Sequence, residues 1–155
     1  MPKPGRQPKN DLPPSTFVLD NGADTIKAGF APRDESTDEQ TLQACQVIPN
    51  LLVKTRDRRT YVAAQTEQIS QWNDGVFRRP IEHGQLVNWP SEQEIWERSL
   101  FDEKTASKNA FIKRPEETTL ILTEAPNILP ALQKNTDEIV MEEWDFGGYS
   151  RLSGA

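Results

Sequence analysis

Short apolar runs separated by turn signals fill the first half of the chain. Residues 16–20 are a run of β-forming residues, the pair Asn21-Gly22 is a turn signal, and residues 25–30 resume the extended pattern. This arrangement predicts a β-hairpin at the start of the folded part.

The middle of the chain predicts two more strands and a helix. Residues 46–49 and 60–62 are apolar runs of strand length on either side of a basic stretch, residues 54–59. We expect that stretch to be a solvated loop rather than a binding patch. Residues 63–72 can be helical until an Asn-Asp-Gly sequence breaks the pattern.

Apolar positions recur at helical spacing in the second half. Ser91 and Glu94 have the capping-box spacing, which predicts a helix over residues 92–101. Residues 118–123 form a continuous apolar run typical of a buried strand, and residues 127–144 predict a second amphipathic helix. Strands followed by helix, strand and helix indicate a mixed α/β fold.

The composition indicates one lean domain. The chain has 155 residues, of which 35% are hydrophobic, with 18 Lys and Arg against 24 Asp and Glu. Residues 1–14 contain five prolines and three basic residues against one acidic residue, so we expect a disordered basic tail before an acidic body, residues 15–155. An acidic body argues against strong direct nucleic-acid binding, and the absence of a run of about 18 apolar residues argues against a membrane span.

Several residues that can carry chemistry have simpler structural roles. A single cysteine, Cys45, and a single histidine, His83, cannot form an internal disulfide or a typical structural zinc site. We expect Cys45 to be half-buried and His83 to be a structural residue in a turn. Trp89, Trp96 and Trp144 are expected in the core. The sequence therefore predicts no catalytic residue and no metal site.

The predicted hairpin is the most informative candidate site. Asp20 ends a strand, Gly22 exposes backbone N–H groups in a turn, and Lys27 lies on the returning strand. Such N–H groups and a lysine can hold a phosphate, while the aspartate can hold Mg²⁺ through water. An ordinary hairpin with a nearby lysine has the same pattern, so spacing alone leaves both interpretations open.

Five blocks make the chain resemble the actin family, in the same order and at nearly the same separations. They are residues 18–30, 80–84, 88–96, 122–126 and 139–142. The resemblance implies a partial actin-like (ribonuclease H-like) ATPase fold: an α/β structure with a mixed sheet and flanking helices, of which this chain covers the first lobe only. It also implies a small inserted subdomain at about residues 50–79, and a chain that ends inside the start of another helix.

In that family the hairpin resembles the first phosphate-binding loop. The resemblance places Asp20 in the water shell of the metal and assigns the β- and γ-phosphate contacts to Gly22, Ala23, Asp24 and Lys27. It implies ATP or ADP with Mg²⁺ in the full-length protein, and we expect no cofactor on this chain alone.

Departures from the family pattern matter for function. Ala23 replaces a serine whose hydroxyl reaches the terminal phosphate, and Asp24 replaces a glycine, which adds negative charge near the anion. The segment 49–61 is shorter than the loop that grips the next protomer in filaments. The glutamine that positions the attacking water aligns near Gly154, beside Ser153, and neither residue can replace its amide.

Further stretches, among them residues 46–50, 76–80 and 84–89, most resemble nuclear, non-filamentous actin-related proteins that are subunits of SWR-type chromatin-remodelling complexes. The resemblance implies a non-catalytic interaction subunit of a histone-variant exchange complex. We expect its partners to be other subunits and the nucleosome or histones, in the nucleus and also in the cytoplasm, with no membrane partner and no filament. An actin-fold ATPase and a cytoskeletal filament protein remain the alternatives.

Overall fold

The computed structural model describes residues 15–32, 39, 43–70 and 75–153. Its centre is a mixed five-stranded sheet with the strand order β10-β9-β1-β2-β3. The strands are β10 (Gly148–Ser153), β9 (Thr118–Glu124), β1 (Ser15–Asn21), β2 (Thr25–Phe30) and β3 (Gln46–Pro49). β1 runs antiparallel to β2 and parallel to β9, and β9 runs parallel to β10.

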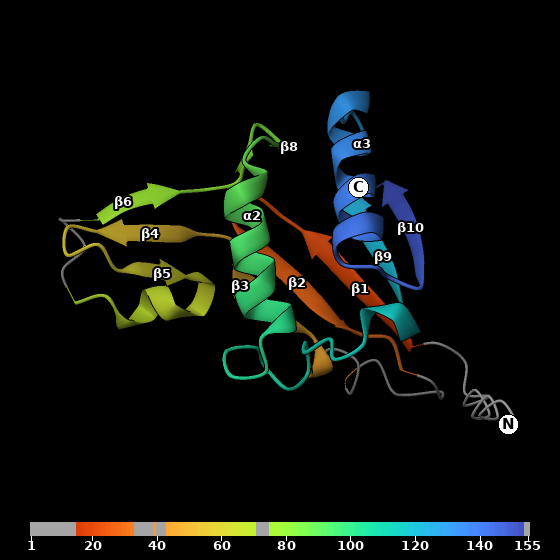
Figure 1. The fold of residues 1–155 in the computed structure, drawn as a ribbon, viewed down its shortest axis with the longest axis horizontal. Helices are drawn as coiled ribbons and strands as arrows, with labels where there is room; N and C mark the ends of the chain where they lie inside the picture. The colour runs from red at the N-terminus through yellow and green to blue at the C-terminus, as the bar shows by residue number, and fades with distance from the viewer. Residues whose placement is uncertain (1–14, 33–38, 40–42, 71–74, 154–155) are drawn as a thin grey trace, which may run out of the picture.

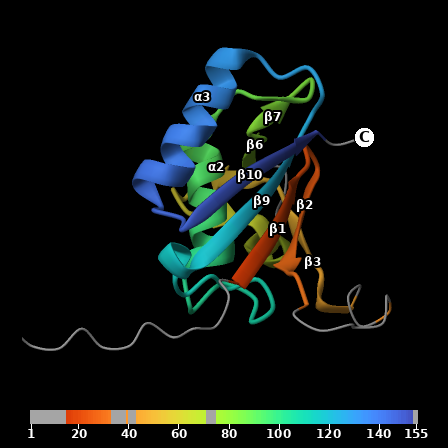
Figure 2. The ribbon, with the colours of Figure 1, turned by 90° about the vertical axis from the view of Figure 1, so that its right-hand side faces the viewer.

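Two helices cover one face of this sheet (Figures 1 and 2). They are α2 (Trp89–Trp96), continued by a π-helical turn, η3 (Glu97–Phe101), and α3 (Pro130–Glu138), continued by η5 (Ile139–Glu143). A short 3₁₀ helix, η4 (Pro115–Glu117), leads into β9. The core lies between helices and sheet and includes Phe17 and Leu19 of β1 with Trp96 and Leu100.

A smaller three-stranded antiparallel sheet, called the small sheet below, extends from the main body (Figure 1). Its order is β5 (Thr60–Val62), β4 (Leu52–Thr55), β6 (Gly75–Arg78), and a 3₁₀ helix, η1 (Ala63–Gln68), follows β5. Leu51, Val53 and Ile69 form its own apolar cluster with the partly buried Tyr61. The inserted subdomain expected at about residues 50–79 falls on this segment.

A two-stranded ribbon connects the small sheet to α2. It consists of β7 (Ile81–Glu82) and β8 (Gln85–Leu86). His83 and Gly84 form the turn between them, with φ angles of 50° and 75°. His83 lies in a turn, as its sequence context predicts, and is exposed there.

The predicted hairpin, the strands 46–49 and 60–62 and the buried strand 118–123 are confirmed. The predicted helix over residues 63–72 is wrong: in its described part, residues 63–70, a 3₁₀ helix spans residues 63–68 and Ile69 is already extended. The predicted cap at Ser91 is also wrong: Asn88 is the cap, and its Oδ1 accepts a hydrogen bond from the Ser91 N–H at 3.2 Å.

The last part of the described chain is a strand that was not predicted: residues 148–153 form β10, parallel to β9. Gly147 makes the approach possible, because a Cβ atom there would lie 2.3 Å from the Glu116 carbonyl oxygen. The end of the chain at Ala155, where the start of another helix was expected, lies outside the described residues. Cys45 is exposed, so the expectation that it is half-buried is wrong. The predicted tail, residues 1–14, lies outside the described residues.

The tryptophan prediction is confirmed. Trp89 and Trp96 are buried and meet edge to face, with ring centroids 5.8 Å apart. Trp96 stacks on the partly buried Trp144 at 4.9 Å. No helix in the described ranges combines the length and apolar content that a membrane crossing requires.

Candidate phosphate-binding hairpin

The turn between β1 and β2 lies at the carboxyl end of β1, beside the carboxyl end of the parallel strand β9. Asp20 is paired in register with both Lys27 and Thr123. Its Oδ1 accepts a hydrogen bond from the Thr123 hydroxyl at 2.6 Å, and its Oδ2 lies 3.6 Å from the Lys27 Nζ. About half of each charged side chain is exposed, so both can reach a ligand.

Gly22 sets the backbone of the turn. Its N–H donates to the Asp20 carbonyl at 3.2 Å, and a Cβ atom at this position would lie 2.5 Å from the Thr25 carbonyl oxygen. Any other residue would therefore force the turn to change. The glycine that the sequence predicts for phosphate approach has a steric role in the hairpin itself.

Asp24 pairs with Arg79, a residue that the sequence prediction missed. The Arg79 Nη1 lies 3.0 Å from the Asp24 Oδ1, and the same nitrogen donates to the carbonyls of Ala23 and Asp24 at 3.3 and 3.4 Å. The charge repulsion expected from Asp24 is therefore partly offset by Arg79. The Asp24 side chain is 83% exposed, which keeps the pair weak in water.

Asn50, directly after β3, is a second residue that sequence reasoning missed. It is fully buried, its Nδ2 donates to the Gly22 carbonyl at 2.9 Å, and its backbone N–H donates to the Asp24 carbonyl at 2.9 Å. Together, Asn50 and Arg79 bind the carbonyls of all three residues of the turn. Side chains distant in sequence thus fix the backbone of the turn through hydrogen bonds to its carbonyl groups.

Glu92 of α2 lies behind Asn50 and has no exposed surface. Its Oε1 accepts hydrogen bonds from the Trp96 Nε1 at 2.7 Å and from the Asn50 Nδ2 at 3.4 Å. Burial raises the pKa of Glu92 to about 7, against the lowering effect of these hydrogen bonds. The sequence carried a signal for this role, since Glu92 lies one helical turn before Trp96 on the apolar stripe.

A cavity of about 250 Å³ opens beside the hairpin. The hairpin contributes Asp20, Asn21, Gly22 and Ala23 to one side. The other walls are mostly apolar and come from the β7–β8 ribbon, α2, the end of β9 and α3; among them are Trp89, Trp96, Leu122 and Leu132. Besides the hairpin, the polar residues of the lining are Thr123 and Glu124 at the end of β9 and Thr136 of α3.

All five predicted contact residues lie on this hairpin, but they do not form one cluster. Asp20 and Lys27 meet, Gly22 shapes the turn, Ala23 offers no side-chain donor, and Asp24 pairs with Arg79. No group of three or more metal-ligating side chains occurs within the described ranges. The position that aligns with the water-orienting glutamine, Gly154, lies outside the described residues.

Comparison with known proteins places these features in context. The model of the family described as Actin matches residues 12–155. The Aspergillus fumigatus protein named actin-like protein arp6 is 56% identical over 147 residues, which are 92% of this chain and 31% of the relative. An Emericella nidulans protein of the same name is 56% identical over 90% of this chain and 30% of its own length.

A third relative is more distant. Actin-related protein 6 of Neurospora crassa is 47% identical over 92% of this chain and 30% of its own length. The chain thus spans about 30% of the length of the curated relatives it matches.

Proposed function

The chain belongs to the actin family, and we propose that it acts as a non-catalytic interaction subunit of a nuclear chromatin-remodelling complex of the SWR type, which exchanges a histone variant. The observation that carries the proposal is the 56% identity to proteins named actin-like protein arp6 across about nine-tenths of the chain. The partners proposed are other subunits of such a complex, with the nucleosome or its histones.

The hairpin supports a role without hydrolysis. Ala23 removes the hydroxyl that the resemblance places against the terminal phosphate, and Arg79 is engaged with Asp24 and two turn carbonyls. Phosphoryl transfer depends on donors held in place around the phosphate. A turn with one donor fewer stabilises the transition state less.

The same residues still fit a bound phosphate in part. Lys27 offers a half-exposed ammonium group, and Asp20 offers a half-exposed carboxylate that also lines the cavity. In the full-length protein, Lys27 and the backbone N–H groups of the turn would hold the phosphates of ATP or ADP, and Asp20 would hold Mg²⁺ through water. A nucleotide bound in this way would stabilise the fold by mass action without being consumed.

The segment 49–61 supports a subunit that does not form filaments. It folds into β4 and β5 with a tight connection, in which the Thr55 N–H donates to the Arg59 carbonyl and the Arg58 N–H to the Thr55 carbonyl, both at 3.0 Å. A long protruding loop is therefore replaced by a compact hairpin.

Affinity purification of the tagged protein from its native cells tests the function. We expect remodelling-complex subunits and histones in nuclear extract at stoichiometric amounts by mass spectrometry. Recovery with cytoplasmic filament proteins instead would favour the cytoskeletal alternative. Phosphate release that scales with protein concentration and disappears in Asp20→Ala would favour the ATPase.

A further inference from the structure

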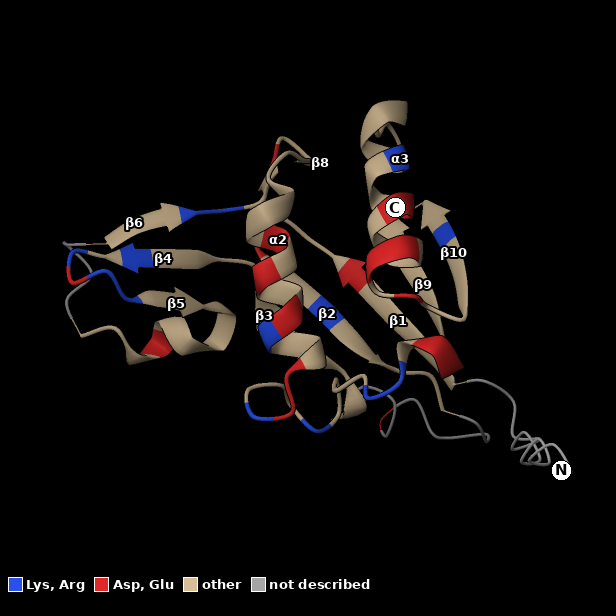
Figure 3. Cartoon of the chain, viewed as in Figure 1, with Lys and Arg blue, Asp and Glu red and all other residues tan. Residues whose placement is uncertain are grey.

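The small sheet is a basic region on an acidic protein. Residues 50–79 contain six Lys and Arg against three Asp and Glu, a net charge of +3, whereas the whole chain has a net charge of −6. The remaining residues therefore carry −9. Figure 3 shows the separation: basic positions mark the ends of β4 and β6 and the β4–β5 connection, while acidic positions concentrate on α2 and α3.

β6 is an open edge of the small sheet. Within the described residues, β6 pairs with β4 alone. Val76 and Phe77, which are adjacent on β6, are 61% and 50% exposed. Edge strands normally carry charge or are covered, because their free N–H and C=O groups accept another strand. An edge with two exposed apolar side chains is suited to pairing.

The two faces of the small sheet differ beside this edge. Lys54 is the cross-strand neighbour of Val76, and Leu52 is that of Arg78, so Lys54, Val76 and Arg78 share one face. Phe77 lies on the opposite face, with its cross-strand neighbour Val53. One face at the edge is thus basic around Val76, and the other is apolar.

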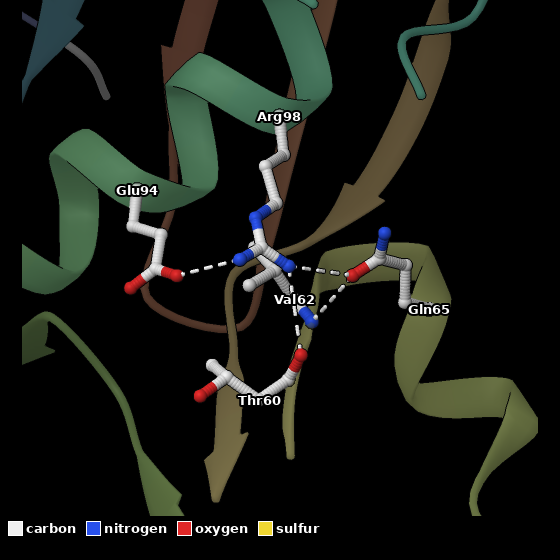
Figure 4. A network of polar contacts seen from close by, with 5 residues as sticks. All are labelled: Thr60, Val62, Gln65, Glu94 and Arg98. Atoms are coloured by element: carbon white, nitrogen blue, oxygen red, sulfur yellow. Dashed lines mark hydrogen bonds and ion pairs between the residues drawn. The ribbon is translucent and has the colours of Figure 1, made fainter. Parts of the chain in front are cut away.

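The opposite side of the small sheet contacts η3, the continuation of α2, through Arg98. The Arg98 Nη1 donates to the Thr60 carbonyl at 3.5 Å and to the Gln65 Oε1 at 3.1 Å, and its Nη2 lies 2.9 Å from the Glu94 Oε1 (Figure 4). The Gln65 Oε1 also accepts a hydrogen bond from the Val62 N–H at 3.2 Å. This network fixes β5 against the main body and leaves β6 as the edge that faces outward.

We propose that the β6 edge binds an extended segment of a partner protein in which acidic and apolar residues alternate, added as a further strand. Alternation places every acidic side chain on the face that Val76 and Arg78 share, next to Arg78 and one strand away from Lys54. It places every apolar side chain on the other face, next to Phe77. Main-chain hydrogen bonds to β6 supply affinity, and the two faces supply specificity.

Other occupants match the edge less well. A second copy of β6 would bring two basic regions together, each with a net charge of +3 over residues 50–79, which is repulsive. A nucleic-acid duplex has no apolar strand to place beside Phe77, and its phosphates would extend over the remaining surface, which is acidic. A short acidic strand would contact only the basic region and not the acidic remainder of the surface.

Binding of a defined peptide tests the proposal. The probe is a fluorescein-labelled peptide of about six residues, the usual length of a strand, in which glutamate alternates with valine. We expect its fluorescence anisotropy to rise with the concentration of the chain, and hydrogen exchange of residues 75–78 to slow when the peptide is added. Arg78→Glu is expected to weaken binding on the order of tenfold. Phe77→Thr should weaken it by removing the apolar contact while keeping a β-forming residue.

The matched control is Lys113→Glu, which reverses an exposed charge outside residues 50–79 and should bind the peptide as the parent chain does. Several results would overturn the proposal: no anisotropy change, equal binding of a lysine-valine peptide, an equal loss in the control, or tighter binding of a short DNA duplex. Sedimentation that shows a dimer abolished by Arg78→Glu would assign the edge to a second copy instead.

This proposal adds a binding surface to the interaction role proposed above. It rests on that role only because it requires a protein partner. The peptide assay uses this chain without any complex. Its failure is therefore distinguishable from a failure of the co-purification experiment.

Discussion

The carboxyl group of Glu92 lies against Trp96 and Asn50 without exposed surface, and its pKa is raised from 4.5 to about 7 by burial. The folded state therefore holds a proton that the unfolded chain releases above its ordinary pKa. The stabilisation that the protonated Glu92 carboxyl group provides is fully present below pH 4.5 and is lost as the pH rises toward 7. Above pH 7 this group causes no further change in stability. The loss amounts to about 3 kcal/mol of unfolding free energy.

Glu92→Gln tests this effect, because glutamine keeps the acceptor oxygen and cannot ionise. We expect the variant to match the parent chain near pH 4.5 and to be more stable above pH 7, by up to about 3 kcal/mol in urea unfolding. Glu97→Gln, at an exposed position one turn later, is the control and should follow the parent curve. If the difference in unfolding free energy between the parent chain and Glu92→Gln did not change with pH, the raised pKa would be contradicted.

A second prediction concerns Asn50. Asn50→Ala leaves the Gly22 carbonyl without its donor and removes one hydrogen bond from the Glu92 carboxyl group. We expect a loss of about 2 kcal/mol in unfolding free energy, since buried groups left unpaired carry their full desolvation penalty. Asn127→Ala, on an exposed loop, is the control. Equal unfolding midpoints for the two variants would show that Asn50 does not hold the turn.

Among the elements, α2 has a start that differs from its sequence pattern. Asn88 caps the helix, while Ser91 is buried within the first turn. We expect Asn88→Ala to lower the unfolding free energy by about 1 kcal/mol, the usual value of a cap. Ser91→Ala keeps the backbone N–H that binds Asn88 and should cost less. If Ser91→Ala lowered the thermal unfolding midpoint more than Asn88→Ala, Ser91 would be the cap, as the capping-box spacing predicts.

The elements that could be predicted carry their signal in adjacent residues. The β1–β2 hairpin has a turn pair between two β-forming runs, and β9 is a continuous apolar run. β10 could not be predicted, because its segment has no alternation and its residues are mostly exposed. Its place is given by contacts distant in sequence: it pairs in parallel with β9, and the Arg151 Nη2 lies 3.4 Å from the Asp137 Oδ2 on α3.

The same distinction applies to the candidate site. Asp20, Gly22 and Lys27 are close in sequence, so their spacing suggests a phosphate site and the family resemblance singles it out. Asn50 and Arg79 reach the turn from 28 and 55 residues away, and their role depends on how the two sheets pack. Local patterns indicate which backbone segment forms a site, whereas side chains that fix its shape come from tertiary contacts.

At the scale of the whole molecule, helices cover one face of the five-stranded sheet, and no element within the described residues covers the other, called the open face below. Phe17 and Leu19 point into the core beneath the helices, and Val18, between them, is 38% exposed on the other face. Val47 and Leu152 lie in the same cross-strand row as Asp20 and Lys27 and are 64% and 53% exposed. Exposed apolar groups spread across a sheet face mark a surface that another element or protein can cover.

The open sheet face leads to the last prediction. The chain of residues 1–155 should bind a hydrophobic dye such as anilinonaphthalene sulfonate. The combined variant Val18→Thr, Val47→Thr and Leu152→Thr should bind less of it. Threonine is β-branched and suits a strand, as valine does, but carries a hydroxyl in place of one methyl group. Val76→Thr removes an equally apolar side chain from the small sheet and should change dye fluorescence less than the triple variant. Circular dichroism of each variant confirms that the strands persist. A parent chain that melts cooperatively as a monomer and leaves the dye dark would show that the face is covered in solution.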